Sequence, residues 1–208
     1  MKVGAVLSRV KISPGFLLFL CAYYYFDPGG TFRYFVFASI CHELGHLLTL
    51  KVLGVPIYRI SLQAGGACLL TAHMSYRDEL LSAAAGPVMN LISALLFLHR
   101  VPVFALVNLT LFLFNLLPFY PLDGGRILRC LLQLLLRGGR AAILTERIIC
   151  LSCIVFLWSL GGYMTCILHE GLWPVLLCSI LTIRISGTIF PEYRNFRNKR
   201  IDKSHIAC

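Results

Sequence analysis

The sequence predicts an all-α polytopic membrane protein with about six transmembrane helices, and three observations support this class. Of its 208 residues, 58% are hydrophobic and only 13% are charged, whereas soluble domains are about half apolar and about a quarter charged. Apolar runs close to the roughly 20 residues that cross a bilayer recur along the chain. Basic residues are also distributed unevenly between the loops that join these runs. The composition therefore favours a membrane protein over an ordinary soluble domain.

The apolar runs are expected to form one integral membrane domain over residues 1–191. The predicted spans are 13–26, 32–53, 80–98, 101–117, 143–168 and 172–190. The first is short, and a signal peptide is the alternative because Lys2, Arg9 and Lys11 precede it. No small-x-small cleavage site follows, however, and the run "AYYYF" suits an interfacial aromatic belt. An uncleaved span is therefore preferred.

Positive charge indicates the orientation of these spans. Six spans with the N-terminus inside put sixteen of the 19 Lys and Arg residues on the cytoplasmic side, against Arg33 and Arg100 outside. This satisfies the positive-inside rule, with both termini in the cytoplasm and a bacterial cell membrane as the expected location. The net charge of +10 then requires no nucleic-acid partner. The basic tail, 192–208, is expected to meet anionic lipid of the bilayer.

The second predicted span carries metal-capable side chains at a depth where ionisable groups are costly and usually functional. His42 and His46 are four residues apart, so on a helix they share a face, about 6 Å apart, and can bind one ion. Glu43 lies one position further on, where it can reach water beside that ion. Zinc hydrolases use two histidines, a third protein ligand and an open position for water. Packing of these polar groups against neighbouring helices is the alternative.

Asp123 is the candidate third ligand, because an anion would offset the charge of Zn²⁺. The other acidic residues lie at span ends, in loops or beside an arginine. Pro118 and Pro121 must interrupt the preceding helix, and Gly124 and Gly125 should loosen the chain that follows. Irregular backbone at membrane depth is tolerated where it is buried or lines a water-filled cavity. With alternating spans, Asp123 and the two histidines fall on the cytoplasmic side, where they can share one zinc ion per chain.

Three motifs in order, "HELGHLL", "AAAGPVMN" and "NLLPFYPLDGGRILR", resemble those of the site-2 protease family of intramembrane zinc metalloproteases. The resemblance implies that His42, His46 and Asp123 bind zinc and that Glu43 is the catalytic base. The span arrangement is most similar to the stage IV sporulation protein FB branch, which releases a sporulation sigma factor from its pro-sequence. That branch often carries a nucleotide-sensing CBS domain after its last span. The printed sequence has only the short basic tail there, so energy sensing is not expected.

Other polar and small residues in the motifs are expected to support the site. Asn115 could join helices or donate a hydrogen bond to the scissile carbonyl oxygen, and its place in the third motif favours the second role. Asn108, on the same helix face, is expected to join helices. Gly86 and Pro87 are expected to let helices pack closely, with Asn90 near the site.

A β-hairpin or re-entrant loop is predicted between the second and third spans. Residues 57–63 alternate imperfectly, Gly65 and Gly66 offer a turn, and residues 67–71 could return as a strand. An exposed edge strand could hold an unwound substrate by β-addition, so Gly65 and Gly66 are candidate substrate-binding positions. A plain connecting loop is the alternative.

These features predict an intramembrane zinc metalloendopeptidase that cleaves a membrane-associated or membrane-tethered protein with zinc-activated water. A sporulation sigma factor pro-sequence is the substrate that the resemblance implies, and a membrane-embedded regulator is a further expected partner. A membrane metal transporter that uses the His/Asp cluster as a transit site is the alternative, and it would not need Glu43. A catalytically idle scaffold is disfavoured by the complete set of ligands and base.

Overall fold

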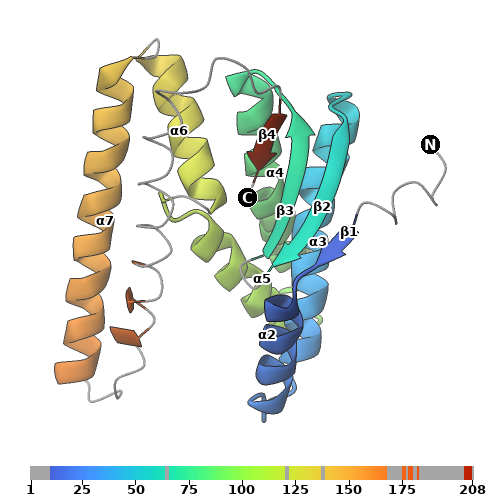
Figure 1. Ribbon diagram of the computed structural model, residues 1–208. Helices are drawn as coiled ribbons and strands as arrows, with labels where there is room; N and C mark the ends of the chain where they lie inside the picture. The colour runs from blue at the N-terminus through green and yellow to red at the C-terminus, as the bar shows by residue number, and fades with distance from the viewer. Residues whose placement is uncertain are drawn as a thin grey trace. The chain divides into compact units, whose positions relative to one another are not determined.

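The computed structural model describes residues 10–63, 66–119, 122–136 and 139–167, with short pieces at 175–176, 178–179, 182 and 204–207. The chain divides into two compact units. The first comprises Met1–Leu116 with Lys203–Cys208, and the second comprises Leu117–Asp202. The described residues are mostly helical, as predicted, and also form a small four-stranded sheet in the first unit (Figure 1).

Three described helices are long and apolar enough to cross a membrane: α3 (Phe32–Val52), α4 (Tyr76–Phe97) and α7 (Arg140–Cys166). They match the second, third and fifth predicted spans. The apolar helices α2 (Pro14–Tyr25) and α5 (Pro102–Asn115) have 12 and 14 residues. These lengths correspond to about 18 and 21 Å, less than the roughly 30 Å hydrocarbon core of a bilayer. The sixth predicted span lies mostly outside the described residues, so six spans stay a prediction.

Capping sets the start of α4 four residues before the predicted apolar run. The hydroxyl oxygen of Ser75 accepts a hydrogen bond from the backbone N–H of Asp78 at 3.2 Å. Asp78 and Glu79 place negative charge in the first turn, where it interacts favourably with the helix dipole. A polar first turn therefore belongs to this helix, although it adds nothing to the apolar pattern.

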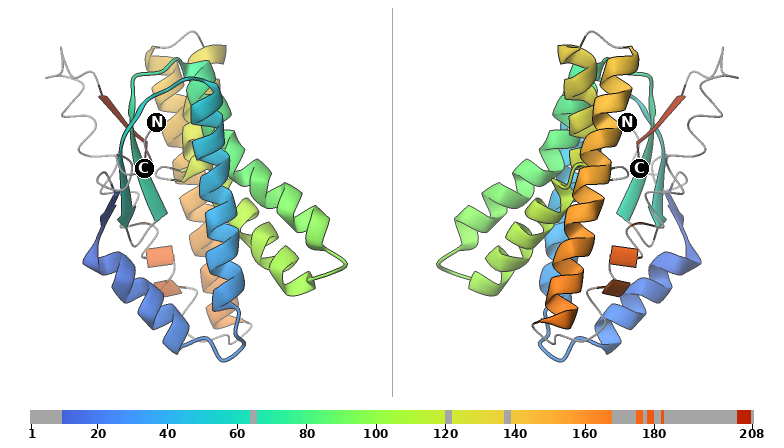
Figure 2. Two further views of the ribbon diagram at one scale, coloured as in Figure 1. Left: turned by 90° about the vertical axis from the view of Figure 1, so that its right-hand side faces the viewer. Right: turned by 90° about the vertical axis from the view of Figure 1, so that its left-hand side faces the viewer.

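Close packing of α3 on α4 depends on a glycine at their crossing. A Cβ atom on Gly45 would lie 2.6 Å from the carbonyl oxygen of Ala85 and 2.7 Å from Cγ of Met89. Both distances are far below van der Waals contact, so only glycine allows this approach. Figure 2 shows α4 and α5 running side by side beyond the crossing. The three helices form the part of the first unit that carries the histidine motif.

The predicted hairpin is confirmed, and it belongs to a larger sheet than expected. Strand β2 (Ile57–Gln63) pairs with β3 (Gly66–Ala72) in antiparallel fashion, with an irregularity near Arg59. Strand β1 (Val10–Ile12) runs parallel to β2, and β4 (Ser204–Ala207) runs antiparallel to β3. The order is β1-β2-β3-β4. The sequence analysis did not predict the two outer strands.

The sheet is attached to α3 through a small apolar core. Leu50 on α3, Leu69 on β3 and Met74 after β3 are all buried and pack together. In Figures 1 and 2 the sheet runs along one side of α3. The hairpin is therefore a fixed part of the first unit, held to the last turns of the helix that carries the histidines.

In the second unit, α6 (Asp123–Leu135) and α7 are joined by an ion pair between Arg129 and Glu146, with Nε and Nη2 each 3.1 Å from Oε1. The expectation that Gly124 and Gly125 loosen the chain is wrong. Both lie buried in the first turn of α6. Glycine can adopt helical backbone angles at a cost of about 1 kcal/mol relative to alanine. Two glycines therefore do not prevent a helix from beginning here. The predicted interruption before Pro118 is observed, since α5 ends at Asn115.

Candidate metal centre

Helix α3 brings His42 and His46 together. Their Nε2 atoms are 3.1 Å apart, and the two rings meet edge to face at an interplanar angle of 81°. Both side chains are buried, with 8% and 6% of their surface exposed. Two imidazole nitrogens at this separation are directed at one another, and an ion that both could bind would lie between or beside them.

Each histidine is held from behind by α4. Nδ1 of His46 lies 2.7 Å from the backbone carbonyl oxygen of Ser82. A carbonyl can only accept a hydrogen bond, so Nδ1 carries the proton and Nε2 presents its lone pair. Nδ1 of His42 lies 3.1 Å from the side-chain amide of Asn90. Partners of this kind fix ring orientation in metal sites.

Gly86 leaves open the space beside the two rings. A Cβ atom at this position would lie 2.6 Å from Cε1 of His46 and 2.7 Å from Cε1 of His42, and closer still to Nε2 of His46. A methyl group would therefore lie against the edges of both rings, including the Nε2 atom of His46. The cradle without a side chain and two buried imidazole nitrogens fit a zinc ion, which prefers nitrogen, sulfur and carboxylate ligands.

Glu43 follows His42 on α3 and is half-buried, unlike the two histidines. A helical residue one position from a ligand points about 100° away from it. The carboxylate therefore sits beside the histidine pair and retains access to solvent. Its role as the base stays a prediction.

Asp123 is the first residue of α6 in the second unit, and it is buried. Nη1 of Arg126 lies 3.6 Å from Oδ1 of Asp123, and both side chains are buried. Arg126 was not predicted from the sequence as a partner of Asp123, although an acid at a helix start followed by a base three residues later is a recognisable pattern. The role of Asp123 as third ligand stays a prediction.

Two asparagines on α5 bond to their own helix. The side-chain nitrogen of Asn115 donates to the carbonyl oxygen of Leu111 at 3.0 Å, and that of Asn108 donates to the carbonyl oxygen of Phe104 at 2.9 Å. Asn108 is fully buried and Asn115 is half-buried. The amide of Asn115 is therefore engaged within α5, and its contact with a substrate oxygen stays a prediction.

The candidate substrate-binding positions lie at the turn between β2 and β3. Gly65 lies outside the described residues, and Gly66 is the first residue of β3. An exposed edge strand was expected in this hairpin, but the outer edge of β3 is paired with β4, from Leu69 opposite Ala207 to Ala72 opposite Ser204. Among the described residues, this edge is therefore occupied by the chain itself.

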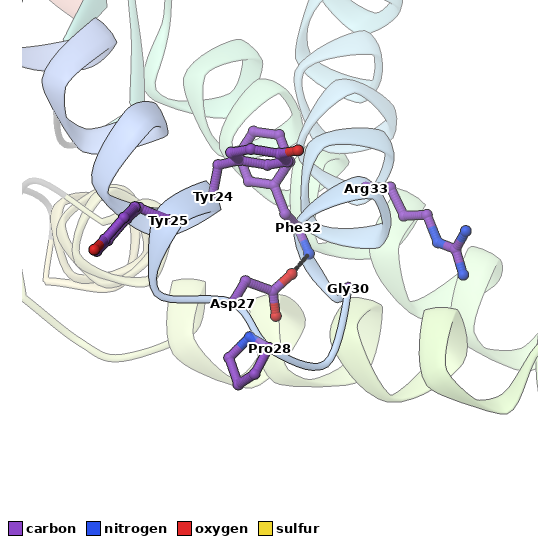
Figure 3. A pocket seen from close by; sticks show the side chains of 7 residues that line it. All are labelled: Tyr24, Tyr25, Asp27, Pro28, Gly30, Phe32 and Arg33. Atoms are coloured by element: carbon purple, nitrogen blue, oxygen red, sulfur yellow. Dashed lines mark hydrogen bonds between the residues drawn. The ribbon is translucent and has the colours of Figure 1, made fainter.

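A pocket lies far from this chemistry, where α2 meets α3. It has a volume of about 550 Å³, opens widely to the surface (Figure 3) and is lined by Tyr24, Tyr25, Asp27, Pro28, Gly30, Phe32 and Arg33. The Asp27 carboxylate accepts hydrogen bonds from the backbone N–H of Phe32 at 2.6 Å and the hydroxyl of Thr31 at 2.8 Å. The first of these is the main cause of the lowered pKa of Asp27. The lining has no cluster of metal ligands, so this pocket is not the hydrolytic site.

Comparisons of sequence point to metalloproteases. The model of peptidase family M50 matches residues 97–160. A zinc metalloprotease of Methanocaldococcus jannaschii is 35% identical over 107 residues, which cover 45% of this chain and 32% of the relative. A Synechocystis protein assigned as a zinc metalloprotease is 34% identical over 113 residues, covering 45% of this chain and 29% of the relative. The chain thus spans about a third of the length of these curated relatives.

Comparison of structure gives a longer match. The solved site-2 protease from Methanocaldococcus jannaschii is similar with a TM-score of 0.56 and 25% sequence identity, and the match covers 81% of this chain and 85% of that one. The names of these proteins do not refer to sporulation, so the sporulation branch stays a prediction. The family model, the curated relatives and the solved structure together support a relationship of this chain to the site-2 protease family, peptidase family M50.

Proposed function

We propose that this chain is an intramembrane zinc metalloendopeptidase that cleaves a membrane-associated or membrane-tethered protein. The observation that carries the proposal is the buried histidine pair on α3. Its Nε2 atoms are 3.1 Å apart, and both rings are held at Nδ1 by α4. Buried ionisable groups in an apolar helix are costly, and a shared metal ion accounts for that cost. The match of residues 97–160 to the model of peptidase family M50 agrees with this assignment.

His42, His46 and Asp123 would hold one zinc ion per chain. Two imidazole nitrogens and one carboxylate oxygen leave the fourth position of a tetrahedral site open. When bound, zinc supplies Lewis acidity, which acidifies a water molecule and polarises a carbonyl oxygen. Asp123 offsets part of the ion's charge. Arg126, 3.6 Å from the Asp123 carboxylate, would hold that carboxylate in a fixed orientation.

Glu43 would act on protons rather than on the metal. Its half-buried carboxylate accepts a proton from the attacking water and returns it to the leaving amine nitrogen. Asn115 would donate its side-chain N–H to the carbonyl oxygen on which negative charge develops. The amide nitrogen has two N–H donors, so one can stay bonded to the carbonyl oxygen of Leu111 while the other donates to the substrate.

The substrate would have to be extended at the cleaved bond, because a helix hides its amide groups. Such a segment could bind to the hairpin of β2 and β3 by β-addition near Gly65 and Gly66. Because β1 and β4 pair with the outer edges of the hairpin, this binding would require one of these short strands to be displaced. A sporulation sigma factor pro-sequence is one substrate of this kind. We place the site toward the cytoplasmic side of a multi-pass protein with both termini inside, where a membrane-embedded regulator could reach it.

Replacing Glu43 with Gln tests the mechanism. Glu43→Gln keeps the size of the side chain but cannot accept the proton, so cleavage of a co-expressed membrane-tethered substrate should fall by about 10²–10⁴-fold. Zinc content measured on the same purified protein should be unchanged. Glu79→Gln alters a half-buried glutamate in the first turn of α4 and should cleave normally. Near-normal cleavage by Glu43→Gln would overturn the mechanism, and a loss of zinc would make Glu43 a ligand.

A further inference from the structure

We propose that Asn90 is a positioning residue for His42. Its side-chain oxygen accepts the Nδ1 proton of His42 and so keeps the Nε2 lone pair of that ring available to the metal. The inference rests on the proposed zinc site and adds to it a residue on α4 that determines which nitrogen of His42 carries the proton.

The surroundings of Asn90 supply the first argument. The side chain is fully buried in α4 and lies with its nitrogen, Nδ2, 3.1 Å from Nδ1 of His42. Its oxygen, Oδ1, has no hydrogen-bond partner among the described residues, and buried amide oxygens without a partner are rare and costly. A half-turn of the planar amide exchanges oxygen and nitrogen with little change in shape. It would give Oδ1 the Nδ1 proton of His42 as its partner.

The proton inventory of the two rings supplies the second argument. Nδ1 of His46 donates to the carbonyl oxygen of Ser82 at 2.7 Å, so Nε2 of His46 has a lone pair. If the nitrogen of Asn90 faces His42, then Nδ1 of His42 is the acceptor and its proton sits on Nε2, where it bonds to Nε2 of His46. That proton occupies the metal-binding position. Only the orientation with the oxygen facing His42 frees both Nε2 atoms for one ion.

The position of Asn90 on α4 supplies the third argument. Asn90 lies four residues after Gly86, so the two share a face of the helix. Gly86 allows the backbone of α4 to approach the rings closely, which brings the short Asn90 side chain within reach of Nδ1. A buried asparagine that only joined two helices would contribute to stability but would have no specific effect on metal affinity.

The test is the zinc affinity of the full chain in detergent, measured by competition with a chromogenic chelator. Asn90→Leu removes the acceptor and should weaken zinc binding by about 10–100-fold, as loss of a partner of a metal-binding histidine does. Asn90→Asp keeps an acceptor but has no donor, so its affinity should stay within a few-fold of the unchanged protein. Asn108→Leu is the matched control, because Asn108 is equally buried and bonds only to its own helix among the contacts described. Its affinity should not change.

Each outcome decides the proposal. Normal affinity in Asn90→Leu overturns it, as does a loss in Asn90→Asp as large as that in Asn90→Leu, which would mean that the nitrogen faces His42. If either variant fails to fold, ¹⁵N spectra of zinc-loaded, histidine-labelled protein decide, with the His42 signals assigned from His42→Gln. A protonated Nδ1 in His42 is expected, and an unprotonated one overturns the proposal. Absence of zinc from the unchanged protein would instead overturn the proposed function, and this inference with it.

Discussion

Near its first residue, α3 borders an open pocket, whereas halfway along its length it carries the histidine pair. The pocket has a volume of about 550 Å³, and its lining includes aromatic rings and one half-buried carboxylate. The histidine region offers two buried rings whose outer nitrogens are both partnered by α4. The polar group of the pocket, the Asp27 carboxylate, already caps the start of a helix.

This difference shows where chemistry is to be sought in an apolar chain. Burial and partners on a second helix fix the orientation of a side chain, and a fixed orientation is what a metal or a transition state requires. An open pocket bordered by solvated groups lacks both. The depth and support of polar groups on α3 are therefore better guides to function than the size of the hollow beside them.

The largest effect is expected from a methyl group at the histidine pair. Gly86→Ala places a Cβ against both imidazole rings, so the rings must move and zinc affinity should fall by at least about 100-fold. Gly162→Ala is the control, because a Cβ at Gly162, on α7, meets nothing within 4 Å. Zinc titration of both purified variants gives the comparison. Normal affinity in Gly86→Ala would mean that the metal does not bind to this side of the rings.

A smaller loss of zinc is expected from the second unit. Asp123→Ala leaves two neutral histidines without an anionic ligand, so zinc occupancy should fall strongly from about one per chain. Asp78→Ala removes a carboxylate that pairs with Ser75 at the start of α4 and should leave occupancy unchanged. Elemental analysis of dialysed protein measures both. Full occupancy in Asp123→Ala would show that the third ligand lies elsewhere.

The smallest effect is expected at the pocket. The pKa of Asp27 is lowered because the ionised carboxylate accepts the N–H of Phe32. A lowered pKa means that the ionised form stabilises the folded state above the unfolded pKa of about 3.9. This contribution is lost as the pH falls through the folded pKa. The amides at the start of α3 should then exchange faster with deuterium, and Asp27→Asn should reduce this pH dependence without affecting zinc. Equal pH dependence in both proteins would contradict this role.

The local pattern of the sequence was enough to predict the three helices that are long and apolar enough to cross a membrane, and the spacing of the histidines on one of them. Helix α6 was not predicted, because Gly124 and Gly125 were expected to loosen the chain. In the structure, both glycines lie in the first turn of that helix. The local pattern missed β1 and β4 because strands of 3 and 4 residues are too short to show alternation. Their pairing also joins segments far apart in the chain, which no local pattern records.

The residues of α4 that form hydrogen bonds with the two imidazole rings were predicted only in general terms. The motif containing Gly86 and Asn90 indicated close helix packing, but not which atoms would meet. The contacts of Ser82 with His46 and of Asn90 with His42 depend on where α4 crosses α3. That crossing is set by the fit of Gly45 against Ala85, a contact between two helices that periodicity along either one cannot show.

The attachment of both rings to α4 also links metal binding to folding. A zinc ion that binds only when α3 and α4 are packed stabilises that packing by RT ln(1 + [Zn]/Kd), or about 2.7 kcal/mol when free zinc is 100 times Kd. This is a sizeable fraction of the 5–15 kcal/mol that is typical for a folded domain. Zinc held by the histidine pair would thus stabilise the packing of α3 on α4 through the hydrogen bonds that hold the two rings, in addition to its chemical role. Its removal would weaken the first unit at the crossing on which the hairpin and the histidines both depend.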